Sequence, residues 1–157
     1  MVAYSFQRRF VAPICLGLGR DIPIGFEVGS GLAEQEPKTH TIRRWGKEKK
    51  PEEPRRHARP GELVQLYHAQ RTKSCIRLGV ARCADALGIF INIGRPKGGP
   101  YIRIDGREPF LKARELDAFA RSDGFGDFGD MADFWTEHHR AIMNDFRGVI
   151  VFWERIT

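Results

Sequence analysis

The sequence predicts an α+β fold, a small mixed β-barrel with flanking helices, formed as a single domain over residues 1–157. About six short segments alternate apolar and polar residues with the period of two that is typical of strands. Apolar residues recur at helical spacing at two points of the chain, and an apolar run near the C-terminus supplies a strand that closes the sheet. With 157 residues, 41% of them hydrophobic, the chain can bury one sizeable core but is short for two ordinary domains.

The N-terminal part predicts a strand and then a helix. Residues Ala3–Phe6 alternate in polarity, and Arg8–Leu16 places apolar residues on one side of a short helix whose first turn tolerates Pro13. The glycine-rich residues 18–37 follow, and we interpret them as an inserted loop or small hairpin. Loops of this length in compact domains are often functional, so this segment is a candidate lid.

The middle of the chain predicts further strands separated by turns. Pro60-Gly61 marks a turn before the first of them, and Asp105-Gly106 marks a tight hairpin-type turn after the last. The predicted strands are Leu63–His68, Cys75–Cys83, Ala84–Asn92 and Tyr101–Ile104.

Two helices and a last strand complete the prediction. The first helix covers Leu111–Ser122 and stops at Gly124, because glycine favours the end of a helix. The second helix carries Met131, Phe134 and Trp135 and ends near His138-His139. The strand Val149–Trp153 then closes the sheet.

The positive charge of the chain is concentrated in one region. The net charge is +6, and residues 38–59 contain nine basic and three acidic residues, which accounts for the whole excess. Residues 44–59 also contain Pro51 and Pro54 and few apolar residues, so we predict a basic surface loop. Such a field attracts phosphate-bearing partners, although a solvated loop that only serves solubility has the same composition.

Cysteine usage and hydropathy favour a cytoplasmic protein without a membrane partner. Cys15, Cys75 and Cys83 are an odd number without close pairs, which argues against a disulfide framework or a zinc knuckle. No apolar run approaches the roughly 18–20 residues of a membrane helix, and the N-terminus lacks the apolar block of a signal peptide. The sequence predicts no cofactor and no metal ligand set, and it does not determine the oligomeric state.

The segment Lys38–Arg43 carries the most chemical information. If it is extended, Thr41 and Arg43 share one face while Ile42 points into the core. A threonine hydroxyl becomes a nucleophile when a neighbouring base takes its proton, which a desolvated lysine can do. Lys38 reaches Thr41 only if the chain turns near Pro37 or the lysine folds back, and a solvated sheet face is the commoner origin of such a pattern.

The run Lys38-Thr-His-Thr-Ile-Arg43 resembles the signature of the ASCH superfamily, whose PUA-like barrels carry Gly-x-Lys-x-x-Thr-x-Arg after the first helix. Tyr4–Ile14 resembles the first strand and helix of that family. Residues Arg59–Glu62 and Leu63–Tyr67 resemble its next turn and strand. The chain has Glu36 where the family has the glycine of the signature, and its insertion at 18–37 replaces a short turn.

One bacterial group of ASCH proteins hydrolyses N(4)-acetylcytidine with the lysine and threonine of the signature and a glutamate from the helical segment. The resemblance therefore implies an amidohydrolase acting on N(4)-acylated cytidine, with Lys38, Thr41 and Asp123 as catalytic residues. Aspartate is one methylene shorter than the glutamate of the family. The substrate-binding candidates are Arg43, which can hold an oxyanion, and Trp45 and Tyr67, which can stack on a base.

Two other functions remain open from the sequence. PUA-like barrels commonly bind RNA and some ASCH proteins resemble ribonucleases, so the basic loop could face RNA, with His40, His57 or His68 as acid–base groups. A binding protein that recognises a modified base with the same pocket is a third alternative. The histidines are scattered, which favours the amidohydrolase over the nuclease.

Overall fold

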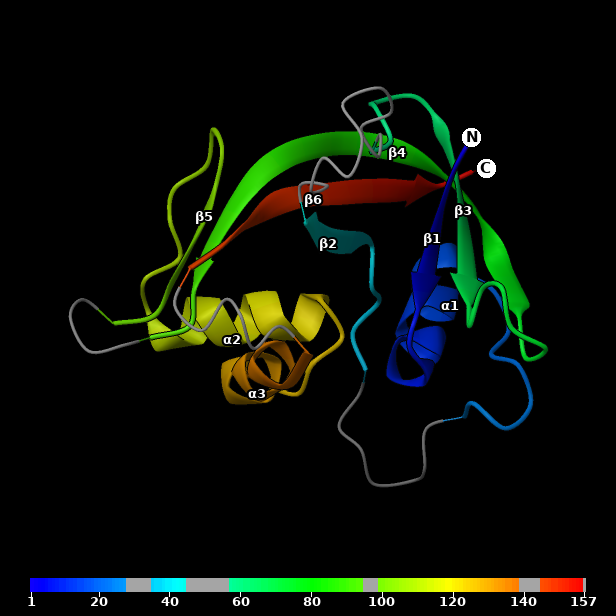
Figure 1. Ribbon diagram of the computed structural model, residues 1–157, viewed down its shortest axis with the longest axis horizontal. Helices are drawn as coiled ribbons and strands as arrows, with labels where there is room; N and C mark the ends of the chain where they lie inside the picture. The colour runs from blue at the N-terminus through cyan, green and yellow to red at the C-terminus, as the bar shows by residue number, and fades with distance from the viewer. Residues whose placement is uncertain (28–34, 45–56, 95–98, 139–144, 157) are drawn as a thin grey trace. The chain divides into compact units, whose positions relative to one another are not determined.

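The computed structural model describes residues 1–27, 35–44, 57–94, 99–138 and 145–156 and confirms an α+β architecture (Figure 1). Within these residues, six strands form one sheet in the order β1-β3-β4-β6-β2, with β5 paired to β4 outside this path. This path has two ends, so the described strands form an open sheet. The strands are β1 (Val2–Phe6), β2 (His40–Arg44), β3 (Leu63–His68), β4 (Ile76–Asn92), β5 (Tyr101–Ile104) and β6 (Asp145–Arg155). The helices are the 3₁₀ turn η1 (Arg8–Phe10) and the α-helices α1 (Val11–Leu18), α2 (Ala113–Ser122) and α3 (Phe128–His138).

The chain divides into two compact units. The first comprises Met1–His40, His57–Ala86 and Val151–Thr157, and the second comprises Thr41–Arg56 and Leu87–Ile150. The strands β2, β4 and β6 each contribute residues to both units.

The core of the first unit lies between α1 and a three-stranded part of the sheet. β1 is parallel to β3, with Tyr4 opposite Leu66, and β3 is antiparallel to β4, with Leu66 opposite Gly79. A Cβ atom at Gly79 would lie 2.7 Å from Cδ1 of Leu18, so α1 packs on the face of the sheet that carries Leu66 and Gly79. The missing side chain at Gly79 makes this close approach possible.

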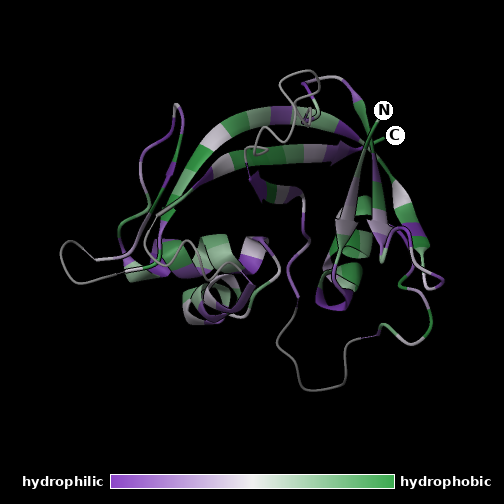
Figure 2. Ribbon diagram, in the orientation of Figure 1, coloured by the Kyte–Doolittle hydropathy of each residue, from purple (hydrophilic) through white to green (hydrophobic). Residues whose placement is uncertain are grey.

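The helix α1 follows from its sequence. Pro13 is its third residue, where the backbone nitrogen has no acceptor inside the helix, so proline costs little there. Gly19 ends the helix with φ 62°, a left-handed conformation that glycine adopts without a steric penalty. Hydrophobic residues predominate along α1, whereas polar and apolar residues alternate along β4 and β6 (Figure 2).

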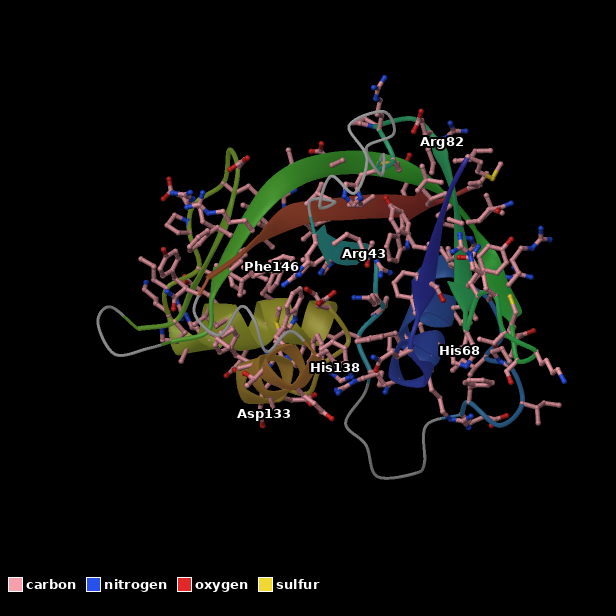
Figure 3. All side chains as sticks on the ribbon, in the orientation of Figure 1. Arg43, His68, Arg82, Asp133, His138 and Phe146 are labelled. Atoms are coloured by element: carbon pink, nitrogen blue, oxygen red, sulfur yellow. The ribbon has the colours of Figure 1, made fainter. Side chains whose placement is uncertain are left out.

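In the second unit, α2 and α3 pack together on one side of its strands. The backbone N–H of Phe128 donates to Asp117 Oδ1 over 3.0 Å, and the rings of Phe125 and Phe134 lie 5.2 Å apart. Phe146 points from β6 toward these helices, and its ring lies 4.4 Å from that of Trp135 in an edge-on arrangement (Figure 3). These contacts form an aromatic core between helices and sheet.

Several element predictions are confirmed, and others are wrong in detail. The helix α2 ends where Gly124 adopts φ 91°, as its sequence predicted. The two strands predicted over 75–92 are one continuous strand, β4, because its buried positions keep the same odd-numbered phase from Gly79 to Ile91. Leu18 ends α1, and residues 19–27 form no strand and leave Ile24 95% exposed, so the described part of the inserted segment is a loop and not a hairpin.

Parts of two predicted loops lie outside the described residues. These are 28–34 of the inserted segment and 45–56 of the basic loop. Among the helices that the structure does describe, none has the length and apolar character needed to cross a membrane.

Candidate functional site

Buried polarity is concentrated in the residues that the sequence singled out. Among the described residues, the buried polar or charged side chains are Lys38, His40, Thr41 and Asp123, each 3–4% exposed. Lysine and aspartate are almost never buried to this extent unless they are paired, because desolvation penalises the charged form. Three of the four are the predicted catalytic residues, and the fourth belongs to the same signature segment.

Lys38 lies in irregular chain just before β2, against the N-terminal end of α1. Its ammonium nitrogen is 5.0 Å from the centre of the Phe10 ring, within the range of a cation–π interaction. Phe10 is itself buried and caps the start of α1. The aromatic face therefore replaces part of the water that would surround an exposed ammonium group.

The backbone around Lys38 is fixed at three points within the first unit. The N–H of Lys38 donates to the carbonyl of Pro13 over 2.9 Å, and the N–H of Trp153 donates to the carbonyl of Thr39 over 2.8 Å. The third point is Gly17, because a Cβ atom there would collide with the carbonyl group of Lys38. Hydrogen bonds to a helix and to a strand thus position the lysine from both sides.

Thr41 and Arg43 lie on β2 as the sequence predicted, but the burial of this strand differs from the prediction. Thr41 is buried, whereas Ile42 is only half-buried, so the prediction that Ile42 enters the core is wrong. The strand approaches β6 closely at Arg43, since a Cβ atom at Gly148 would collide with the carbonyl oxygen of Arg43. The tertiary position of β2 therefore decides which of its faces is covered.

Asp123 is the residue that caps the C-terminal end of α2. Its backbone N–H donates to the carbonyls of Phe119 and Ala120, both at 3.1 Å, and Gly124 then reverses the chain. The helix thus supplies the hydrogen-bond acceptors for the backbone N–H of Asp123, and the side chain of Asp123 is buried. A buried carboxylate at a helix end is an uncommon feature, since most helix-end aspartates are solvated.

Tyr67 lies on the other face of the sheet from α1 and Lys38. Residues alternate along β3, so Tyr67 faces away from its buried neighbour Leu66, which points to α1. The hydroxyl of Tyr67 donates to Gln65 Oε1 over 3.2 Å on that face. The structure does not bring Tyr67 together with Lys38, and Trp45 lies outside the described residues.

The predicted catalytic residues are divided between the two units. Lys38 belongs to the first unit, and Thr41 and Asp123 belong to the second. Only three peptide units join Lys38 to Thr41, so their Cα atoms are at most about 11 Å apart. Chain connectivity thus limits the separation of the two backbones, and it does not by itself place the amine beside the hydroxyl.

The sequence did not indicate the aromatic partner of Lys38. Phe10 is remote from Lys38 along the chain, and no local pattern signals a contact of that kind. His40, which we considered only for a ribonuclease, is buried with its ring 5.5 Å from that of Phe152. His40 is therefore packed inside the first unit.

The described residues contain no group of three or more histidine, cysteine, aspartate or glutamate side chains that could hold a metal ion. No protein-family model, curated protein or solved structure matches the chain.

Proposed function

We propose that the protein is an amidohydrolase that removes the acyl group from N(4)-acylated cytidine or cytosine nucleosides, with Lys38, Thr41 and Asp123 as its catalytic residues. The observation that carries the proposal is the burial of these three side chains, which a solvated charged sheet face would not require. Its chemical basis is the resemblance of residues 38–43 to the ASCH signature. The PUA-like barrel and a cytoplasmic location belong to the same proposal.

The proposed reaction has two steps. Lys38 takes the proton of Thr41, whose oxygen attacks the carbonyl carbon of the amide and forms an acyl ester as the bond to N4 breaks. The proton that Lys38 has taken passes to the leaving amine, and Asp123 orients the lysine and relays this proton. Water then hydrolyses the ester, which releases the carboxylic acid and restores the threonine hydroxyl.

Two further features of the described structure support these roles. Burial and the three backbone anchors hold Lys38 in a fixed position beside the Phe10 ring and away from bulk water, as a catalytic base requires. Arg43 lies two residues from Thr41 on the same strand face, where its guanidinium can stabilise an oxyanion.

Hydrolysis of N(4)-acetylcytidine tests the proposal directly. Turnover is followed by the change in absorbance as cytidine forms, and Lys38→Met should lower kcat/KM by about 10²- to 10⁴-fold, the usual contribution of a general base. Thr41→Val should abolish turnover and the acyl adduct that mass spectrometry detects after rapid quenching. Asp123→Glu, which restores the residue of the family, should retain activity, whereas Asp123→Asn should lose it.

Matched controls separate catalysis from folding. Thr39→Val makes the same chemical change two residues from Thr41 at an exposed position and should leave turnover intact. Lys73→Met does the same for lysine at an exposed turn. Equal turnover by the wild type and by a folded Thr41→Val variant would exclude threonine as the nucleophile.

The RNA-binding alternative depends on the basic loop, and most of that loop lies outside the described residues. If it is correct, replacing Lys47, Lys49 and Lys50 by alanine weakens binding to RNA and leaves nucleoside hydrolysis unchanged. The observation in its favour is the concentration of the whole charge excess in residues 38–59.

A further inference from the structure

A cluster of aromatic and arginine side chains lies on the outward face of the second unit. β4 and β5 are antiparallel, with Phe90 opposite Arg103 and Asn92 opposite Tyr101. The alternate residues Ile89, Ile91, Ile102 and Ile104 are buried on the other face. Phe90, Tyr101 and Arg103 therefore point away from the core, and Phe90 and Tyr101 are only half-buried.

The members of this cluster are stacked in an ordered way. The rings of Phe90 and Tyr101 have centroids 5.5 Å apart and planes 21° apart. The guanidinium carbon of Arg103 lies 5.7 Å from the centre of the Phe90 ring, and that of Arg147 lies 5.5 Å from it. Both arginines are exposed, so the cluster combines two nearly parallel rings with two guanidinium groups close to the Phe90 ring.

We propose that this face binds single-stranded nucleic acid, with bases stacked on Phe90 and Tyr101 and with Arg103 and Arg147 contacting bases or phosphates. Aromatic side chains on an accessible sheet supply stacking surfaces for any unpaired base, and arginine adds charge and planar stacking. A duplex hides the faces of its bases, so single strands fit this surface. An acidic peptide lacks the π-faces that the ring pair matches.

A carboxylate marks one end of the surface. Asp105 packs over Gly88, which lies two residues before Phe90 on the same outward face. The negative charge of Asp105 repels phosphates at this end of the surface. The bound nucleic-acid strand should therefore run past the aromatic pair toward the arginines and avoid the turn at Asp105. This proposal is independent of the hydrolase, because it uses none of the catalytic residues.

Fluorescence anisotropy with labelled 12-nucleotide probes of the same pyrimidine sequence, one RNA and one DNA, tests the proposal on the full chain. Phe90→Leu and Tyr101→Leu, which keep an apolar side chain, should each raise Kd by roughly 5- to 100-fold through lost stacking. Arg103→Gln with Arg147→Gln should weaken binding and reduce the slope of log Kd against log salt by about 0.7 for each lost phosphate contact. The RNA and DNA arms identify which strand is preferred.

Two further variants complete the design. Arg77→Gln removes an exposed arginine from the first-unit part of β4 and should leave Kd unchanged. Asp105→Asn replaces Asp-Gly by Asn-Gly, which favours the same kind of hairpin turn, and should tighten binding because it removes the repulsion of phosphates. The exposed arginine and Asp105 variants keep the test valid if an aromatic variant fails to fold.

Three results would overturn the proposal. The first is that the wild type binds neither probe at low salt. The second is that folded Phe90→Leu and Tyr101→Leu variants bind as tightly as the wild type, which would make the cluster a purely structural cation–π contact. The third is binding to anionic lipid vesicles without binding to either probe, which would assign the arginines to a membrane surface.

Discussion

Gly17→Ala tests whether α1 holds the lysine segment in place. Gly17 has helical backbone, so alanine would ordinarily stabilise α1 by up to about 1 kcal/mol. At this position, however, the new Cβ would lie 3.1 Å from the carbonyl carbon of Lys38 and closer still to its oxygen. Ordinary contacts of this kind are roughly 3.5–4.0 Å, so the backbone at Lys38 has to move.

The expected cost of Gly17→Ala can be worked out from these contacts. Overpacking costs about 1–3 kcal/mol, and loss of the hydrogen bond from Lys38 to Pro13 adds roughly 0.5–1.5 kcal/mol. After the gain in helix propensity, about 2 kcal/mol of stability is lost. For a chain of this size that lowers Tm by about 4–8 °C, which calorimetry measures.

A second helical glycine supplies the control for this experiment. Gly129 is in α3, and the nearest atom to a Cβ atom there is Oδ1 of Asp127 at 3.2 Å, so a side-chain shift of a few tenths of an ångström accommodates it without movement of the backbone. Gly129→Ala should leave Tm unchanged or raise it slightly. If Gly17→Ala is as stable as Gly129→Ala, the packing of α1 against Lys38 does not constrain the lysine, and the argument for its fixed position fails.

Three more predictions concern the aromatic core, pH and the thiols. Trp135→Ala should cost about 3–5 kcal/mol in chemical denaturation, because it empties the buried space beside Phe146, and a loss under 1 kcal/mol would contradict that packing. The side chain of Glu115 accepts hydrogen bonds from the backbone N–H groups of Lys112 and Leu111, which hold its pKa below the ordinary value of 4.5. These bonds stabilise the fold above that pH, and their contribution is lost as the pH falls through the lowered pKa. Glu115→Gln should therefore flatten the dependence of stability on pH in acid, and an unchanged dependence would contradict this reasoning. Burial raises the pKa of the Cys15 and Cys83 thiols, so a thiol reagent at pH 8 should label exposed Cys75 first and the other two only after unfolding.

Local sequence patterns were sufficient for much of the fold. The alternation in Leu63–His68 gave β3 with its bounds, and the hairpin turn at Asp105-Gly106 is present after β5. The end of α2 at Gly124 follows from a single residue type, because glycine adopts the left-handed conformation that terminates a helix. These features depend on neighbouring residues, and the chain displays them without tertiary information.

Other features could not be read from neighbours along the chain. The run Ile89-Phe90-Ile91 is apolar throughout, so its pattern hides the fact that Phe90 faces outward while both isoleucines are buried. Similarly, the half-buried state of Ile42 and the burial of Thr41 depend on which elements cover β2. Alternation of polar and apolar residues with a period of two predicts a strand with two faces, but it does not determine which face other elements of the fold cover.

The sequence by itself determined the α+β class, most of the strands and helices, and the choice of Lys38, Thr41 and Asp123 as chemically distinctive residues. Only the tertiary structure showed that these side chains are buried, that Phe10 lies beside the Lys38 ammonium group, and that Tyr67 is on the opposite face of the sheet from α1. The physical reason is the range of the interactions involved. Propensity and periodicity act over a few residues, whereas burial and cation–π contacts join residues that only the folded chain brings together.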